Sequence, residues 1–149
     1  MVDKNDVMRG DIIRLKKWAF EVVEIHSNSV TGHLLTYGVG TFIETWPKVD
    51  GYEITEDLLK ALGFEPIDEK MNGWEYTEFK GEHNKGYKIT YSLKDKTLTV
   101  LNEPTKSRGF CYAYVTYLHE LQHIYKSFRI DYSGMYKRMR DYQLPTDIG

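Results

Sequence analysis

Short apolar segments separated by turn residues fill the first 50 positions of the chain. The segments are 11–15, 18–25, 29–37 and 41–46, and they are rich in β-branched and aromatic residues, which favour strands. Turn residues at 26–29 and 38–40 separate them, and Pro47 ends the run. Four or five short strands with no helix between them predict a small antiparallel barrel or a strongly bent sheet.

Residues 54–64 carry the clearest local signal for a helix. Thr55 can cap the first turn, Glu56 and Asp57 favour the positive end of a helix, and Gly63 suits the left-handed position after the last turn. We therefore expect a helix of about two turns. Its leucines should pack against the sheet; they are Leu58, Leu59 and Leu62.

A second group of strands follows at 74–79, 87–93 and 97–101, which predicts a three-stranded meander. In the middle strand, large apolar residues alternate with polar ones, so one face of this meander should be buried and the other wet. The apolar positions of that strand are Tyr87, Ile89 and Tyr91.

We interpret residues 110–130 as one long amphipathic helix that covers the meander. Apolar side chains repeat at helical spacing along one stripe. The stripe consists of Tyr114, Tyr117, Leu118, Leu121, Ile124, Tyr125 and Phe128. Cys111, the only cysteine, would be a small buried group near the start of this helix.

The same stretch contains the pentapeptide HELQH at 119–123, which has the H-E-x-x-H form of zinc peptidases. In that form His119 and His123 would be metal ligands on one helical face, and Glu120 would be the general base. Both histidines lie opposite the apolar stripe and share their side with Lys126. We therefore expect an exposed, solvated face and no metal.

The ligand count also argues against zinc. A catalytic zinc ion has three protein ligands, and this stretch supplies two. The extended metzincin pattern is absent, because Lys126 stands where glycine is required and Arg129 where the third histidine would be. A zinc-dependent metallopeptidase remains the alternative to a structural helix.

Three regions follow from these patterns, and the fold class is α+β. Residues 1–50 form an SH3-like β-barrel lobe, and residues 51–130 form a lobe of helix, meander and long helix. Residues 131–149 form a tail, either a solvated extension or a short helix. The cations of the tail could instead grip an acidic partner; they are Lys137, Arg138 and Arg140.

The composition narrows the class of protein. The chain has 149 residues, 41% hydrophobic and 28% charged, which is typical of a globular protein. The net charge of −2 gives no bulk attraction to nucleic acid or membrane. No signal peptide or membrane-spanning run is present, so we expect a cytoplasmic protein with no membrane partner. A single cysteine excludes an internal disulfide.

Three segments resemble a family of small uncharacterised proteins of Bacteroides-type bacteria and their phages. Residues 8–13 match its R-x-G-N/D-x-V segment, 54–64 its L-T-E-E-x-L-x-x-x-G-F helix, and 117–125 its Y-V-H-x-L-Q-N-L-Y helix. In that family Gln typically stands at the position of Glu120 and Asn at that of His123. The resemblance therefore implies that H-E-x-x-H arose here by chance, and it implies no established activity.

We expect a non-enzymatic accessory or interaction protein, of phage or mobile-element origin, with an unknown protein partner and no cofactor. The second alternative, after the zinc peptidase, is nucleic-acid binding by the first lobe, because cations beside aromatic rings can track a phosphate backbone and stack bases. The acidic residues Glu21, Glu24 and Glu44 of that lobe oppose this alternative. Its candidate residues are Arg9, Arg14, Lys16, Lys17 and Trp18.

Overall fold

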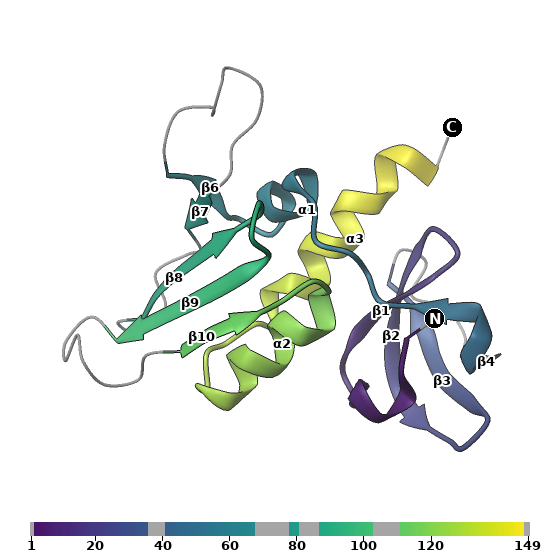
Figure 1. The fold of residues 1–149 in the computed structure, drawn as a ribbon. Helices are drawn as coiled ribbons and strands as arrows, with labels where there is room; N and C mark the ends of the chain where they lie inside the picture. Colours follow the sequence, from purple (N-terminus) through teal and green to yellow (C-terminus); the bar gives the residue numbers. More distant parts are fainter. Residues whose placement is uncertain (1, 36–40, 68–77, 81–86, 103–110, 148–149) are drawn as a thin grey trace.

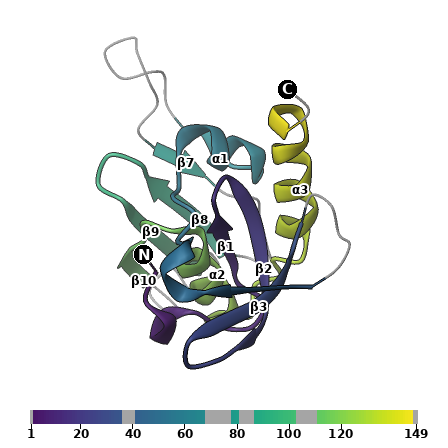
Figure 2. The same cartoon turned by 90° about the vertical axis from the view of Figure 1, so that its right-hand side faces the viewer.

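The computed structural model describes residues 2–35, 41–67, 78–80, 87–102 and 111–147 (Figure 1). Its first sheet is antiparallel, has five strands in the order β4-β3-β2-β1-β5, and curls into a half-barrel (Figure 2). The strands are β1 (Ile12–Leu15), β2 (Trp18–Ile25), β3 (Ser29–Leu34), β4 (Phe42–Thr45) and β5 (Val49–Asp50). A 3-10 helix, η1 (Lys4–Asp6), precedes β1, and a second, η2 (Trp46–Lys48), lies between β4 and β5. The predicted bent antiparallel sheet is confirmed.

A bulge in β2 shapes this sheet. The register between β2 and β3 shifts between Val22 and Glu24, and such a bulge bends the strand that contains it. Gly32 of β3 lies opposite Val22, where a side chain would collide with the backbone of β2. The apolar cluster inside the curl consists of Val2, Val7, Ile13, Leu15, Phe20, Val22, Val30, Trp46 and Val49.

The second sheet is also antiparallel, with the order β10-β9-β8-β7-β6. Its strands are β6 (Glu65–Pro66), β7 (Glu78–Lys80), β8 (Tyr87–Ser92), β9 (Thr97–Asn102) and β10 (Cys111–Tyr114). Strands β8 and β9 match the predicted segments 87–93 and 97–101. Most of the predicted strand 74–79 lies outside the described residues. Ile89 and Tyr91 are buried whereas Lys88 is exposed, so the predicted alternation in β8 is confirmed.

The prediction of one long helix over residues 110–130 is wrong. Cys111–Tyr114 form β10, which pairs with β9, and helix α2 begins only at Leu118 and ends at Ser127. Tyr112 and Tyr114 are 59% and 76% exposed. Successive side chains of a strand point to opposite faces, so these two tyrosines share the open face of the sheet, and Tyr114 does not belong to a buried helical stripe.

Helix α1 (Glu56–Ala61) forms as its caps predict. The Oγ1 atom of Thr55 accepts a hydrogen bond of 3.2 Å from the N–H of Leu58. Gly63 has a φ of 95°, the left-handed conformation expected after a helix. The three leucines of this segment are buried, as expected: Leu58, Leu59 and Leu62.

The tail contains helix α3 (Gly134–Asp147), which is long and partly buried. Met135 and Met139 are 6% and 0% exposed and belong to the main apolar cluster. A guanidinium N–H of Arg138 donates to the carbonyl of Leu62 after α1. The prediction of a solvated extension or short helix is therefore wrong, because α3 supplies core residues.

Helix α2 lies between the two sheets (Figure 1). The main apolar cluster joins Ile12 and Ala19 of the first sheet, and Leu35 just after β3, to the helices and to the second sheet. Its members in the second sheet are Ile89, Tyr91, Leu98 and Val100. Two faces of α2 are consequently covered, which determines where the side chains of HELQH lie. Among the described residues, no helix is long and apolar enough to cross a membrane.

Candidate functional site

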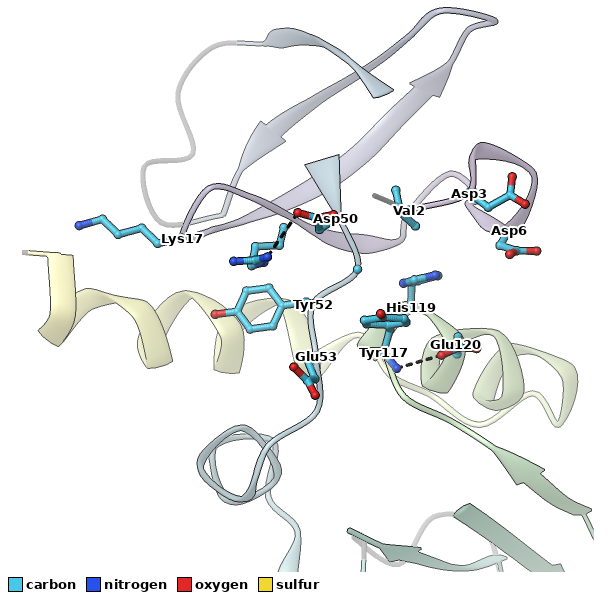
Figure 3. A pocket seen from close by; sticks show the side chains of 12 residues that line it. Val2, Asp3, Asp6, Lys17, Asp50, Tyr52, Glu53, Tyr117, His119 and Glu120 are labelled. Atoms are coloured by element: carbon cyan, nitrogen blue, oxygen red, sulfur yellow. Dashed lines mark hydrogen bonds and ion pairs between the residues drawn. The ribbon is translucent and has the colours of Figure 1, made fainter. Parts of the chain in front are cut away.

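A cleft of about 730 Å³ opens where the N-terminal segment, the end of the first sheet and the start of α2 meet (Figure 3). Its lining consists of Val2, Asp3, Asp6, Arg14, Lys17, Asp50, Gly51, Tyr52, Glu53, Tyr117, His119 and Glu120. We call it the interlobe cleft. It brings together residues more than a hundred positions apart in the sequence.

The segment that follows β5 runs antiparallel to the residues that start α2. The N–H of Leu118 donates to the carbonyl of Tyr52 at 2.8 Å, and the N–H of Ile54 donates to the carbonyl of Thr116 at 3.0 Å. Gly51 permits this approach, because a Cβ atom there would lie 2.6 Å from the ring of Tyr117. The cleft wall therefore requires glycine at this position, or a displaced tyrosine ring.

His119 lies behind that ring and is only 2% exposed. Its imidazole stacks on Tyr117, with 5.8 Å between ring centroids and 13° between planes, and meets His123 edge-on. The Nδ1 atom of His119 is buried and has no hydrogen-bond partner among the described residues. Burial lowers the pKa of His119, although the charges of Asp11 and Glu120 act in the opposite direction. The ring is therefore neutral at pH 7, with one acceptor nitrogen.

The prediction that both histidines lie on an exposed face is wrong. His119 is buried and His123 is 28% exposed at its side chain. The sequence shows one apolar stripe on this helix, and we assumed one packing partner. In the folded chain the opposite side of α2 meets β1 and the residues just before it, and there polar contacts replace apolar ones.

Those polar contacts connect α2 to residues 8–12. The Nε2 atom of His123 lies 2.7 Å from Oδ2 of Asp11, a carboxylate that is 3% exposed. Oε1 of Gln122 accepts from the N–H of Ile12 at 2.8 Å, and its Nε2 donates to the carbonyl of Gly10 at 3.2 Å. Gln122 and His123 thus hold the first sheet against α2.

Glu120 has a structural partner as well. Its Oε1 accepts hydrogen bonds from the N–H groups of Thr116 and Tyr117, at 3.0 and 2.9 Å. These bonds satisfy donors at the start of α2, as in a capping box. The candidate general base and the candidate ligand His123 are both engaged in contacts that hold the fold. Among the described residues, no three His, Cys, Asp or Glu side chains are grouped to hold a metal ion.

The candidate nucleic-acid residues are divided between two ends of β1. Arg9 precedes that strand and Lys16 follows it, and both are exposed. Arg14 pairs with Asp50 at 3.3 Å, and the Nζ atom of Lys17 lies 5.0 Å above the ring of Trp18. Arg14 and Lys17 line the interlobe cleft, where carboxylates outnumber them.

Sequence reasoning missed several residues of the cleft, above all Asp3, Asp6, Tyr52 and Glu53. No motif contains them, and they acquire a common environment only when α2 packs against the first sheet. Comparisons with protein-family models, curated proteins and solved structures found no match to this chain. The chemistry of the cleft is therefore the basis for its proposed function.

Acidification is expected to destabilise the fold through His119. Because burial holds the pKa of His119 below the ordinary 6.5, the folded protein binds this proton less readily than the unfolded chain does. The contribution of neutral His119 to the free energy of unfolding is complete above pH 6.5 and is lost as the pH falls through the pKa of His119 in the folded protein. Urea unfolding at several pH values should show a shallower pH dependence in His119→Gln than in the wild type. Equal dependence in both proteins would contradict this assignment.

Proposed function

We propose that this chain is a non-enzymatic interaction protein whose interlobe cleft receives part of a partner protein. In this proposal the first lobe is an SH3-like barrel, and the helices dock it onto the second sheet. The observation that carries the proposal is the difference between neighbouring side chains at the start of α2. Gln122 and His123 make contacts that hold the fold, and Glu120 caps the helix at the edge of the cleft. His119 and Tyr117, by contrast, line an open cleft.

An origin in a phage or mobile element, and kinship with the Bacteroides-type family, are part of the same proposal. The segments that carry this resemblance contact one another in the fold. Gln122 in the third segment binds Gly10 and Ile12 in the first. Leu58 and Leu59 of the second segment belong to the same buried cluster as Leu118 and Leu121 of the third. Contacts between the segments support the view that they mark one architecture.

Site-specific photo-cross-linking tests whether the cleft receives a partner. Benzoylphenylalanine in place of Tyr117, which is 39% exposed and lines the cleft, should cross-link one protein in lysate of the producing cell. The same amino acid in place of Tyr112 is the matched control, because Tyr112 is exposed on β10 outside the cleft lining. Capture of the same proteins from both positions, or of none from position 117, would contradict the proposal.

A further inference from the structure

The charges of the interlobe cleft are segregated. Asp3 and Asp6, both exposed on the N-terminal segment, lie on the same side as His119 and Glu120, whereas Lys17 lies at the opposite end (Figure 3). We call the part formed by Asp3, Asp6 and His119 the acidic end. A ligand that enters the cleft therefore meets opposite potentials at its two ends.

Negative charge dominates the lining as a whole. It includes five carboxylates and two permanent cations. One of those cations, Arg14, pairs with Asp50 within the cleft itself. His119 adds no positive charge at pH 7, because its burial keeps the imidazole neutral. The net potential of the cleft therefore favours a cation.

The acidic end offers hydrogen-bond acceptors to a ligand. Ionised Asp3 and Asp6 are acceptors only, and a neutral imidazole has one acceptor nitrogen. The Nδ1 atom of His119 is buried and has no partner among the described residues, and the residue as a whole is only 2% exposed. An unsatisfied buried polar atom is costly and marks a position where a ligand or a local rearrangement can supply a partner. A ligand rich in N–H donors complements this set.

One wall of the acidic end is aromatic. The ring of Tyr117 stacks on His119 there and lines the cleft, and long basic side chains bury their methylene stems along apolar surface while the charged head stays in a polar environment. Lysine carries three N–H donors on such a stem and arginine carries five. The aromatic wall, the negative charge and the hydrogen-bond acceptors therefore all favour a lysine or arginine side chain.

We propose that the acidic end of the interlobe cleft binds a lysine or arginine side chain of the partner protein. The inference rests on the proposed function and adds the chemistry of the partner. An acidic segment would meet repulsion from Asp3 and Asp6, and a purely apolar segment would supply no donor to these carboxylates or to the imidazole.

Peptide titrations followed by amide chemical shifts of the full chain test this inference. The probes are glycine-flanked peptides with a central arginine or lysine, compared with the same peptides carrying citrulline or acetyl-lysine. We expect the two basic peptides to shift the amides of Tyr117 and His119, and the two neutral analogues to leave them unchanged. Raised salt should weaken the binding, because the attraction is electrostatic.

The matched variants are Asp6→Asn in the cleft and Glu65→Gln, an exposed residue of β6 outside the cleft lining. Asp6→Asn should lower the affinity for the basic peptides about threefold to fivefold, as expected for one exposed charge pair, and Glu65→Gln should leave it unchanged. Equal binding of the neutral analogues, or equal affinity in Asp6→Asn, would overturn the inference. If the basic peptides do not bind while position 117 still cross-links one protein, the assignment of a basic group is wrong and the proposed interaction function stands. If the basic peptides do not bind and position 117 cross-links no protein, the inference and the proposed function are both rejected.

Discussion

Gly32→Ala is expected to lower the free energy of unfolding by at least about 3 kcal/mol, the upper range for overpacking in a well-packed interior. A Cβ atom at this position would lie 2.1 Å from the backbone oxygen of Glu21 and 2.7 Å from the ring of Phe20. The oxygen belongs to the neighbouring strand β2, and Phe20 is fully buried in the curl of the first sheet. Neither group can move without disturbing the sheet, so urea unfolding should show a large loss or no folded protein.

Gly134→Ala is the matched control for this substitution. No atom lies within 4 Å of a Cβ at Gly134, which begins α3. Alanine has the higher helix propensity and restricts the unfolded chain, so the variant should be as stable as the wild type or more stable. A Gly32→Ala protein that unfolds at the same urea concentration as Gly134→Ala would contradict the close approach of β2 and β3.

Gln122→Leu is expected to cost about 1–3 kcal/mol, because the buried N–H of Ile12 loses its acceptor. Leucine preserves much of the side-chain volume but cannot accept a hydrogen bond, and the site is only 1% exposed. The carbonyl of Gly10 keeps a partner, since the hydroxyl of Tyr136 also donates to it at 2.6 Å. Urea unfolding followed by circular dichroism measures the loss.

Tyr136→Phe separates the two bonds to Gly10. It removes one donor from a carbonyl that Gln122 still satisfies, so its cost should be about 1 kcal/mol or less. If Gln122→Leu were as stable as the wild type, or less damaging than Tyr136→Phe, then α2 would not hold the first sheet in the way described.

Local signals in the sequence predicted much of the fold. The cap at Thr55, the left-handed Gly63 and the alternation in β8 each depend on a few neighbouring residues, and each is confirmed. The α+β class and the curled first sheet follow from such signals too. Strand β10 escaped detection, because it is four residues long and adjoins the apolar start of α2.

Contacts between distant parts of the chain could not be predicted in the same way. The periodicity of α2 gave one buried face, but the side chains that meet the first sheet are polar, so their burial left no apolar signature. His119 and Gln122 are the clearest cases, at 2% and 1% exposure. The interlobe cleft depends on that second contact, and two of its acidic residues, Asp3 and Asp6, come from the opposite end of the chain.

We propose that HELQH holds the two sheets together and lines the interlobe cleft, in place of forming the zinc site that its spacing suggests. The direct test is the metal content of untagged protein after incubation with excess zinc and dialysis, compared with a His119→Ala, His123→Ala double variant. We predict that the wild type retains no more zinc than the variant, because Glu120 and His123 are engaged elsewhere. About one zinc per chain that disappears in the variant would contradict the claim and favour the metallopeptidase.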